Sequence, residues 1–186
     1  MIDKFFYFVQ QKIDLSEQDE ELFRYGLESL ICDCSDFFAV IMISLFLHDL
    51  FNAVVYIVLF SVLRVYTGGW HAMTKKRCLC VYIVLYLVYY ITRSNLHSSL
   101  IYGLGYAAGS IYTCFEAPVE HIYAPLDCAE RRKNHNAAVF YIGLYTMLSV
   151  ICFYRFNIIY RTICLVTVIN ACMMEFLKHT AYWRQP

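Results

Sequence analysis

The sequence of 186 residues carries little charge, and the charges that it has cancel. Lys, Arg, Asp and Glu together make up 16% of the residues, and the formal net charge is zero. Soluble domains usually contain about 25% charged residues. Because nucleic-acid binding depends on a surplus of cations, this balance gives no reason to expect nucleic acid among the partners.

The chain also lacks the features of a secreted protein. Charged residues interrupt its first fourteen positions, so the apolar core of a secretory signal is missing there. Its nine cysteines are odd in number and lack the spacing of a disulfide scaffold. Most of them fall inside apolar runs, where a free cysteine behaves as a small hydrophobic residue. We therefore expect a reduced setting that faces the cytoplasm.

Hydrophobic residues, by contrast, are abundant, at 60% of the chain. They gather in six runs with the bounds 29–48, 50–63, 79–92, 98–115, 137–154 and 157–177. A membrane-spanning helix needs about 20 residues, with a range of about 17–25, so the first, fourth, fifth and sixth runs are long enough. The second and third runs are shorter. They either cross the membrane with tilted or extended ends or form a re-entrant hairpin.

The residues before these runs have a different pattern. Four apolar residues within 3–14 share one helical face: Phe5, Phe6, Val9 and Ile13. That face suits a helix in the membrane interface and suits packing on the rest of the protein equally well. Ser16 and the acidic residues after it predict the start of another helix. We therefore expect one membrane domain, 1–186, with interfacial N-terminal helices over 1–28 and a bundle over 29–177. The expected class is an all-α, polytopic membrane bundle.

The cations are distributed unevenly between the polar segments. If the N-terminus is cytoplasmic and all six runs cross, twelve of the fifteen cations lie on the cytoplasmic side. Those twelve lie in the segments 1–28, 64–78, 116–136 and 178–186. The positive-inside rule predicts such a bias, and a hairpin of the second and third runs would preserve it. We therefore expect a multi-pass protein of the cell membrane, with both long polar segments on the cytoplasmic side.

The segment 64–80, RVYTGGWHAMTKKRCLC, is the longest polar interruption in the first two-thirds of the chain. It places His71 seven residues before Cys78. The residues directly before this thiol are cations, Lys75, Lys76 and Arg77. Neighbouring cations and a helix N-terminus stabilise a thiolate, and an imidazole can accept and return its proton. Thr74 suits a helix N-cap, which leaves His71 in a loop that can fold back. These residues fit a catalytic pair and a basic loop at lipid headgroups about equally well.

Other polar residues offer supporting roles. Arg64 suits a headgroup anchor, or a planar donor that orients a substrate carboxylate or carbonyl. In the second polar segment, 116–135, Glu116 or Glu120 can orient His71 as the third member of a triad does. A basic cluster follows, consisting of Arg131, Arg132 and Lys133. It can hold acidic lipids or an acidic peptide tail, although the ordinary excess of cytoplasmic charge explains it equally well.

Two further patterns concern metals and acids. Glu120 and His121 match part of an inverted zinc motif, but Ala117 stands where that motif needs another His. We therefore expect no metal and no cofactor.

Three acids interrupt the apolar runs: Asp33, Asp36 and Glu175. Acids in a membrane are usually paired inside the bundle or mark a pathway, and the sequence does not identify their partners.

Two ordered motifs give the chain a resemblance to a known family. Arg64, the run Gly68-Gly69-Trp70-His71-Ala72 and Cys78 resemble the signature of the accessory gene regulator protein B (AgrB) family. The run 117–133 is similar to that family's second signature, except that Tyr123 stands where Asn is common. The resemblance implies a membrane cysteine endopeptidase of Gram-positive bacteria that cleaves a quorum-sensing propeptide and cyclises it to a thiolactone. It implies Cys78 as nucleophile, His71 as general base and acid, and Arg64 and Gly69 as supporting positions.

The expected partners follow from this resemblance. They are the lipid bilayer and a membrane-associated propeptide with an acidic C-terminal tail, and a homodimer suits a bundle of this small size. Two alternatives belong to other functional classes. A small transporter or channel would use the three in-membrane acids as a path. A non-enzymatic membrane interaction subunit would contain no unusually reactive cysteine.

Overall fold

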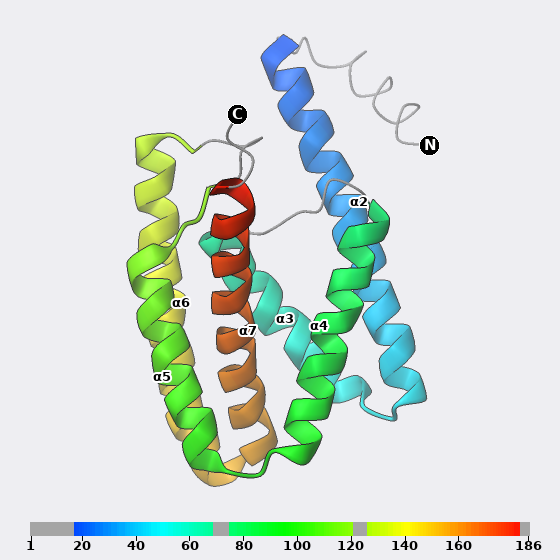
Figure 1. Cartoon of the computed structure of the whole chain (residues 1–186), viewed down its shortest axis with the longest axis vertical. Coiled ribbons are helices and arrows are strands. Elements are labelled where there is room, and N and C mark those ends of the chain that lie inside the picture. The colour runs from blue at the N-terminus through cyan, green and yellow to red at the C-terminus, as the bar shows by residue number, and fades with distance from the viewer. Residues whose placement is uncertain (1–16, 69–74, 121–125, 183–186) are drawn as a thin grey trace.

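The structure, a computed structural model, describes residues 17–68, 75–120 and 126–182 (Figure 1). These residues contain six helices and no strand: α2 (Glu17–Phe46), α3 (Leu50–Thr67), α4 (Lys75–Asn95), α5 (Ser99–Glu116), α6 (Cys128–Arg155) and α7 (Asn157–Tyr182). Each predicted apolar run corresponds to one helix, which confirms the all-α class. The interfacial helix predicted within 3–14 lies outside the described residues. Helix α2 continues without a break across 28–29, so the predicted N-terminal part and the first run share one helix.

Four helices of the described chain are long and apolar enough to cross a membrane: α3, residues 77–95 of α4, α6 and residues 157–179 of α7. The second and third runs are therefore longer as helices than the sequence indicated, with 18 residues in α3 and 21 in α4. Both helices continue into the basic residues at their polar ends, whose long side chains can extend toward water. Helices α2 and α5, which contain most of the first and fourth runs, are not among the four. Six crossings remain a prediction.

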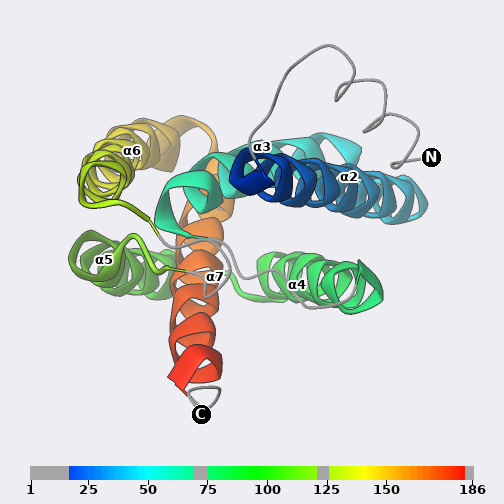
Figure 2. The same cartoon turned by 90° about the horizontal axis from the view of Figure 1, so that it is seen from above.

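Helix α7 is the central element of the bundle. Figure 2 shows it between α5 and α6 on one side and α4 on the other, and it packs against α3 as well. Of its membrane-capable segment, 56% is buried inside the protein, whereas the value for α3, α4 and α6 is 28% or less. The outer helices expose large apolar side chains, among them Phe38, Phe115, Phe140 and Tyr154. Such broad apolar surfaces indicate a lipid environment.

An aromatic core joins α3 to α4. On α3 the buried residues Ala53, Tyr56, Phe60, Leu63 and Thr67 recur every three or four positions, as one helical face does. On α4 the buried face consists of Cys78, Tyr82, Tyr86 and Tyr89. The rings meet across the two helices, with centroids 4.6 Å apart for Tyr56 and Tyr89 and 5.6 Å for Phe60 and Tyr82. This packing fixes which side of α4 faces inward.

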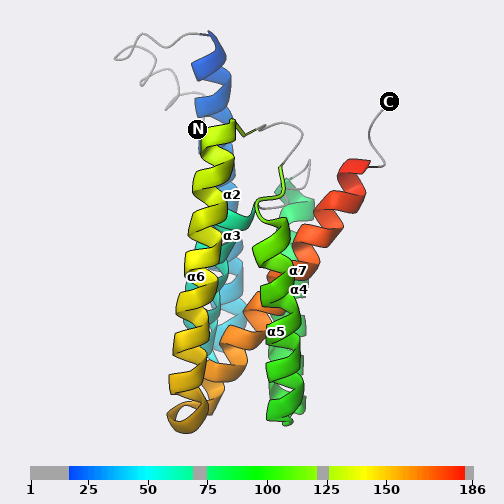
Figure 3. The same ribbon diagram turned by 90° about the vertical axis from the view of Figure 1, so that its left-hand side faces the viewer.

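The two polar segments border the same end of the bundle. Figures 1 and 3 show the last turns of α3, α5 and α7 and the first turns of α4 and α6 at one end, which we call the polar end. The connections between α2 and α3, between α4 and α5 and between α6 and α7 lie at the opposite end. Residues near 64–78 and near 116–136 are thereby brought together, although about 50 positions separate them in the sequence.

Candidate active site

Cys78 occupies the first turns of α4 at the polar end and points into the bundle. Its side chain is only 5% exposed, because it begins the buried face that continues with Tyr82. Helix α4 starts at Lys75, where the predicted cap at Thr74 would place its first residue. Cys80, two residues later, faces outward and is exposed, as the helical period requires. The helical period of α4 therefore buries the thiol of Cys78 and exposes that of Cys80.

An aspartate from α2 contacts this thiol. The Cys78 S–H donates a hydrogen bond to Oδ2 of Asp36, with an Sγ–Oδ2 distance of 3.4 Å, and Asp36 is 1% exposed. One turn earlier on α2, Oδ1 of Asp33 lies 3.8 Å from Nη1 of Arg64, at the polar end of α3. The two acids to which the sequence assigned no partner therefore belong to the surroundings of Cys78. We call Asp33, Asp36, Arg64 and Cys78 the thiol cluster.

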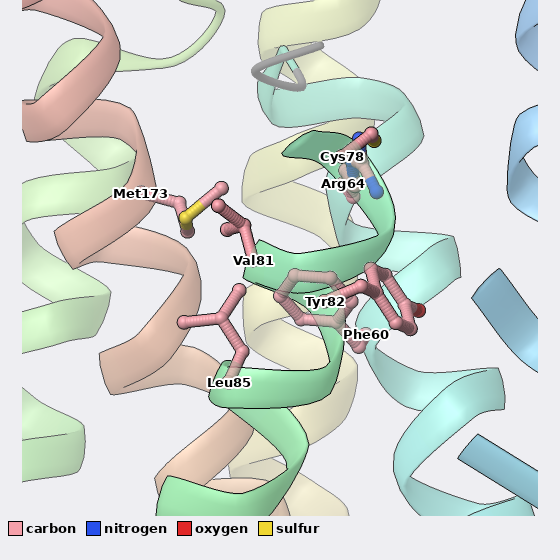
Figure 4. Close-up of a pocket in the computed structure, with 7 residues that line it drawn as sticks. All are labelled: Phe60, Arg64, Cys78, Val81, Tyr82, Leu85 and Met173. Carbon is pink, nitrogen blue, oxygen red and sulfur yellow. The ribbon is translucent and has the colours of Figure 1, made fainter. Parts of the chain in front are cut away.

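A small cavity lies beneath the thiol cluster. Its rim includes Cys78 and Arg64, and its walls are apolar or aromatic: Phe60, Val81, Tyr82, Leu85 and Met173 (Figure 4). The guanidinium carbon of Arg64 lies 5.9 Å from the centroid of the Tyr82 ring, a cation–π distance. The cavity volume is about 10 Å³, which is room for about one water molecule. A substrate side chain could enter only after these side chains move.

The second polar segment is docked onto the end of α3. The backbone N–H of Val119 donates to the carbonyl oxygen of Thr67 over 2.9 Å, and the Thr67 hydroxyl donates to Oδ1 of Asn170 on α7 over 3.1 Å. Gly68 follows with φ = +87°, and a Cβ there would lie 2.1 Å from the carbonyl oxygen of Val119. Both the positive φ and this close approach require glycine. The contact joins the two sequence motifs where the glycine pair begins.

The same segment is fixed from α6. Nδ1 of His135 lies 2.8 Å from the carbonyl oxygen of Ala117, so that nitrogen carries the proton in this hydrogen bond. Asp127 and Glu130 form a capping box at the start of α6. Helix α6 thereby begins at a defined position, with Arg131, Arg132 and Lys133 exposed in its first turns. These three cations lie at the polar end, as the sequence predicted.

The predicted supporting glutamates have partners in the described chain. Glu116 forms an ion pair with Lys178 of α7, and Glu120 lies 3.5 Å from Arg131 of α6. Glu175, the third in-membrane acid, accepts a hydrogen bond from Tyr112 and lies 3.2 Å from Nε2 of His179. An effect of either glutamate on His71 stays a prediction, since His71 and Gly69 lie outside the described residues.

Of the three cations directly before Cys78, the structure describes only one side chain. Arg77 is exposed in the first turn of α4, whereas for Lys75 and Lys76 the structure describes only the helical backbone. Among the described residues, no group of three or more His, Cys, Asp or Glu side chains could hold a metal. The sequence did not indicate the roles of Asp36, Thr67 and Asn170. For Asp36 and Asn170 the available signal is a polar residue inside an apolar run, whereas Thr67 lies in the polar segment 64–80 and stands out from its neighbours by no such signal.

These features define a class: a helical membrane protein with a buried thiol and paired charges at its polar end. The family model described as accessory gene regulator B matches residues 2–174, which include both polar segments. The chain therefore belongs to the AgrB family. It takes part in the processing of quorum-sensing peptides by the accessory gene regulator system, as the family does. Neither the curated proteins nor the solved structures contain a significant match.

Proposed function

We propose that this protein is a membrane-embedded cysteine endopeptidase that cleaves a quorum-sensing propeptide near its C-terminus and cyclises the product. The observation that carries the proposal is the placement of Cys78 on the inward face of α4, in contact with charged groups at the polar end. Membership of the AgrB family supports the substrate class. The site would face the cytoplasm of a Gram-positive bacterium, in one membrane domain that covers the chain.

The first step forms an acyl-enzyme. The sulfur of Cys78, after loss of its proton to a base, attacks the carbonyl carbon of the scissile peptide bond. The carbon–nitrogen bond breaks, and the acidic C-terminal tail leaves as an amine that takes up a proton. In this proposal His71 accepts the thiol proton and returns it to the leaving amine. The N-terminal part of the propeptide is then bound to Cys78 as a thioester.

The second step closes the ring. An internal cysteine of the propeptide attacks the thioester, its proton returns to Cys78, and a cyclic thiolactone leaves. One thioester replaces another, so the step is nearly balanced in energy, whereas hydrolysis of the acyl-enzyme would be strongly favourable. The site must therefore keep water away from the acyl group. The 5% exposure of Cys78 and the apolar walls beneath it support this requirement.

Arg64 is suited to orient the substrate. Its guanidinium is 12% exposed and can donate several hydrogen bonds in one plane, and its distance of 3.8 Å from Asp33 is longer than a tight ion pair. A substrate carbonyl or carboxylate can therefore compete for it. The exposed cations Arg77, Arg131, Arg132 and Lys133 would attract the acidic tail to the polar end.

The test compares two thiol variants in proteoliposomes with the propeptide made by the same bacterium. Cys78→Ala should release no tail above background, as followed by gel electrophoresis and mass spectrometry. Cys80→Ala is the matched control, two residues away and exposed, and should keep most of the activity. Full processing by the Cys78 variant, or loss of processing only in the Cys80 variant, would overturn the assignment of the nucleophile.

The transporter alternative has no specific support in this structure. It required Asp33, Asp36 and Glu175 to form one path, but the first two lie in the thiol cluster and Glu175 contacts Tyr112. Ion or peptide flux through vesicles that persists in the Cys78→Ala variant would favour that alternative. The interaction-subunit alternative predicts instead that no cysteine reacts unusually with thiol reagents.

A further inference from the structure

Asp36 contacts the sulfur of Cys78 directly. Its side chain is 1% exposed, and its Oδ2 accepts the S–H hydrogen bond over 3.4 Å. Its other oxygen, Oδ1, is buried and has no hydrogen-bond partner among the described residues. A buried carboxylate with an unused oxygen is costly unless a further donor reaches it. Packing between α2 and α4 alone therefore does not explain a carboxylate at this position.

Among the described groups around the sulfur, carboxylates outnumber cations. Helix α2 contributes the carboxylates of Asp33 and Asp36, α3 contributes the guanidinium of Arg64, and α4 contributes the phenol of Tyr82. From α7 the cavity receives only the thioether of Met173. Within the described part of the site, two carboxylates thus lie near the guanidinium of Arg64. A thiolate at Cys78 would be a third anion beside that cation, and like charges at this range oppose ionisation.

We propose that Asp36 is a positioning residue that acts through Cys78. It holds the thiol toward α2 by accepting the S–H bond, and its negative charge keeps the sulfur protonated until a base removes the proton. The inference rests on the proposed function of Cys78 as a nucleophile. It adds regulation of that nucleophile. The protonated thiol reacts slowly with electrophiles from water, and its ionisation requires a change in the charge around Oδ1 of Asp36.

The first readout is the pH dependence of Cys78 alkylation in the full-length protein, in nanodiscs without substrate. Iodoacetamide is applied at a series of pH values, and mass spectrometry follows the rate on the peptide that contains Cys78. Asp36→Asn keeps the size and an acceptor oxygen but removes the charge. We expect it to lower the pH of half-maximal alkylation by about one unit. Asp33→Asn, the control one turn away, should shift it by less than half as much.

An unchanged or higher midpoint in the Asp36→Asn variant would overturn the proposal. A purely structural role for Asp36 would change the amount of folded protein and the maximal rate but would leave the midpoint in place. A shift in the Asp33→Asn variant as large as that in Asp36→Asn would also contradict it, because the charge would then act without the direct contact to sulfur.

The second readout is tail release from the propeptide as a function of pH. Asp36→Asn should process the propeptide with its rising limb displaced to lower pH, because orientation of the thiol is retained. Asp36→Ala should lose at least about tenfold in rate, because nothing then holds the sulfur. Equal rates in Asp36→Ala and the unsubstituted protein would overturn the positioning role. Failure of the proposed function itself would be distinguishable, since Cys78→Ala would then still process the propeptide while the alkylation midpoints still reported on the Asp36 contact.

Discussion

Two acid–arginine pairs lie at opposite ends of the bundle, and they differ in length and in exposure. At the end away from the polar segments, Nη2 of Arg93 lies 2.7 Å from Oδ2 of Asp49, and both side chains are at most 10% exposed. Asn52 donates to the other oxygen of Asp49 over 2.6 Å, and Arg93 also donates to the Tyr89 hydroxyl. At the polar end, Arg64 and Asp33 are 3.8 Å apart, and Asp33 is 36% exposed.

The same residue types therefore have different uses in one fold. The Asp49–Arg93 pair is closed, because hydrogen bonds inside the protein occupy both carboxylate oxygens, and its role is to connect α3 to α4. The Asp33–Arg64 pair is open, and it lies beside a thiol and a small cavity. A closed pair contributes to stability, whereas a longer, partly exposed pair beside a cavity can exchange partners with a ligand. Substitutions at the two ends should separate these roles.

The largest effect on stability is expected at the closed pair. Arg93→Ala leaves the carboxylate of Asp49 buried without its cation, which costs about 3–5 kcal/mol in unfolding free energy. Thermal unfolding in detergent, followed by tryptophan fluorescence, should show a large loss of stability. The double variant Arg93→Leu with Asp49→Leu should recover much of it, because no charge is then left unpaired. A single variant as stable as the original would show that the pair is not structural.

The next largest effect is expected where the two motifs meet. Gly68→Ala would place a methyl group 2.1 Å from the carbonyl oxygen of Val119, at a backbone φ of +87°. We expect a loss of about 1–3 kcal/mol in stability, together with loss of propeptide processing, because the segment before His71 is displaced. Gly143→Ala is the matched control, since nothing lies within 4 Å of a Cβ there. Processing that survives Gly68→Ala unchanged would contradict the docking of the two segments.

A smaller effect is expected from one buried hydrogen bond at the same place. Thr67→Val removes the hydroxyl that donates to Oδ1 of Asn170 and keeps the shape of the side chain. An amide oxygen left without its donor costs about 1–2 kcal/mol. Chemical denaturation should show this change, and Asn170→Leu combined with Thr67→Val should be less destabilised than the sum of the two single variants. Strict additivity would mean that the two side chains do not interact.

At the Asp33–Arg64 pair the main expected effect is on activity. Arg64→Ala should cost less unfolding free energy than Arg93→Ala, because the nitrogen–oxygen distance is longer and Asp33 is 36% exposed. Tail release should nevertheless fall by about tenfold or more, since a substrate group loses its donor. Arg64→Lys should restore only part of the rate, because an ammonium lacks the planar fork. Equal effects of Arg64→Ala and Arg93→Ala on stability would remove the distinction between the two pairs.

The sequence predicted the helices well because each apolar run has clear edges. The apolar runs are shorter than α3 and α4, because hydrophobicity stops near the first charged residue, whereas the helices continue through Arg64 and from Lys75 onward. The start of α4 at Lys75 agrees with the local signal in the sequence, a Thr at position 74 that suits an N-cap. The inward direction of Cys78 was not predictable, because it depends on the aromatic packing of α4 against α3.

The surroundings of the thiol include groups that the sequence did not indicate. The sequence predicted cations near Cys78, since three of them precede it in the chain. In the structure Arg77 is exposed, the side chains of Lys75 and Lys76 are not described, and carboxylates from α2 lie beside the thiol, with Arg64. Sequence neighbours of a helical residue spread over all its faces, whereas tertiary neighbours come from other helices. Asp36 stands 42 positions before Cys78, so no local pattern could indicate their contact.

The most direct test of the account is to trap the acyl-enzyme. A propeptide whose internal cysteine is replaced by alanine can acylate the enzyme but cannot close the ring. Incubated with the protein in nanodiscs, it should leave its N-terminal part attached to the peptide that contains Cys78, through a thioester that hydroxylamine removes. An adduct on Cys80 or Cys128, or tail release without any hydroxylamine-sensitive adduct, would contradict the assignment of Cys78 as the nucleophile.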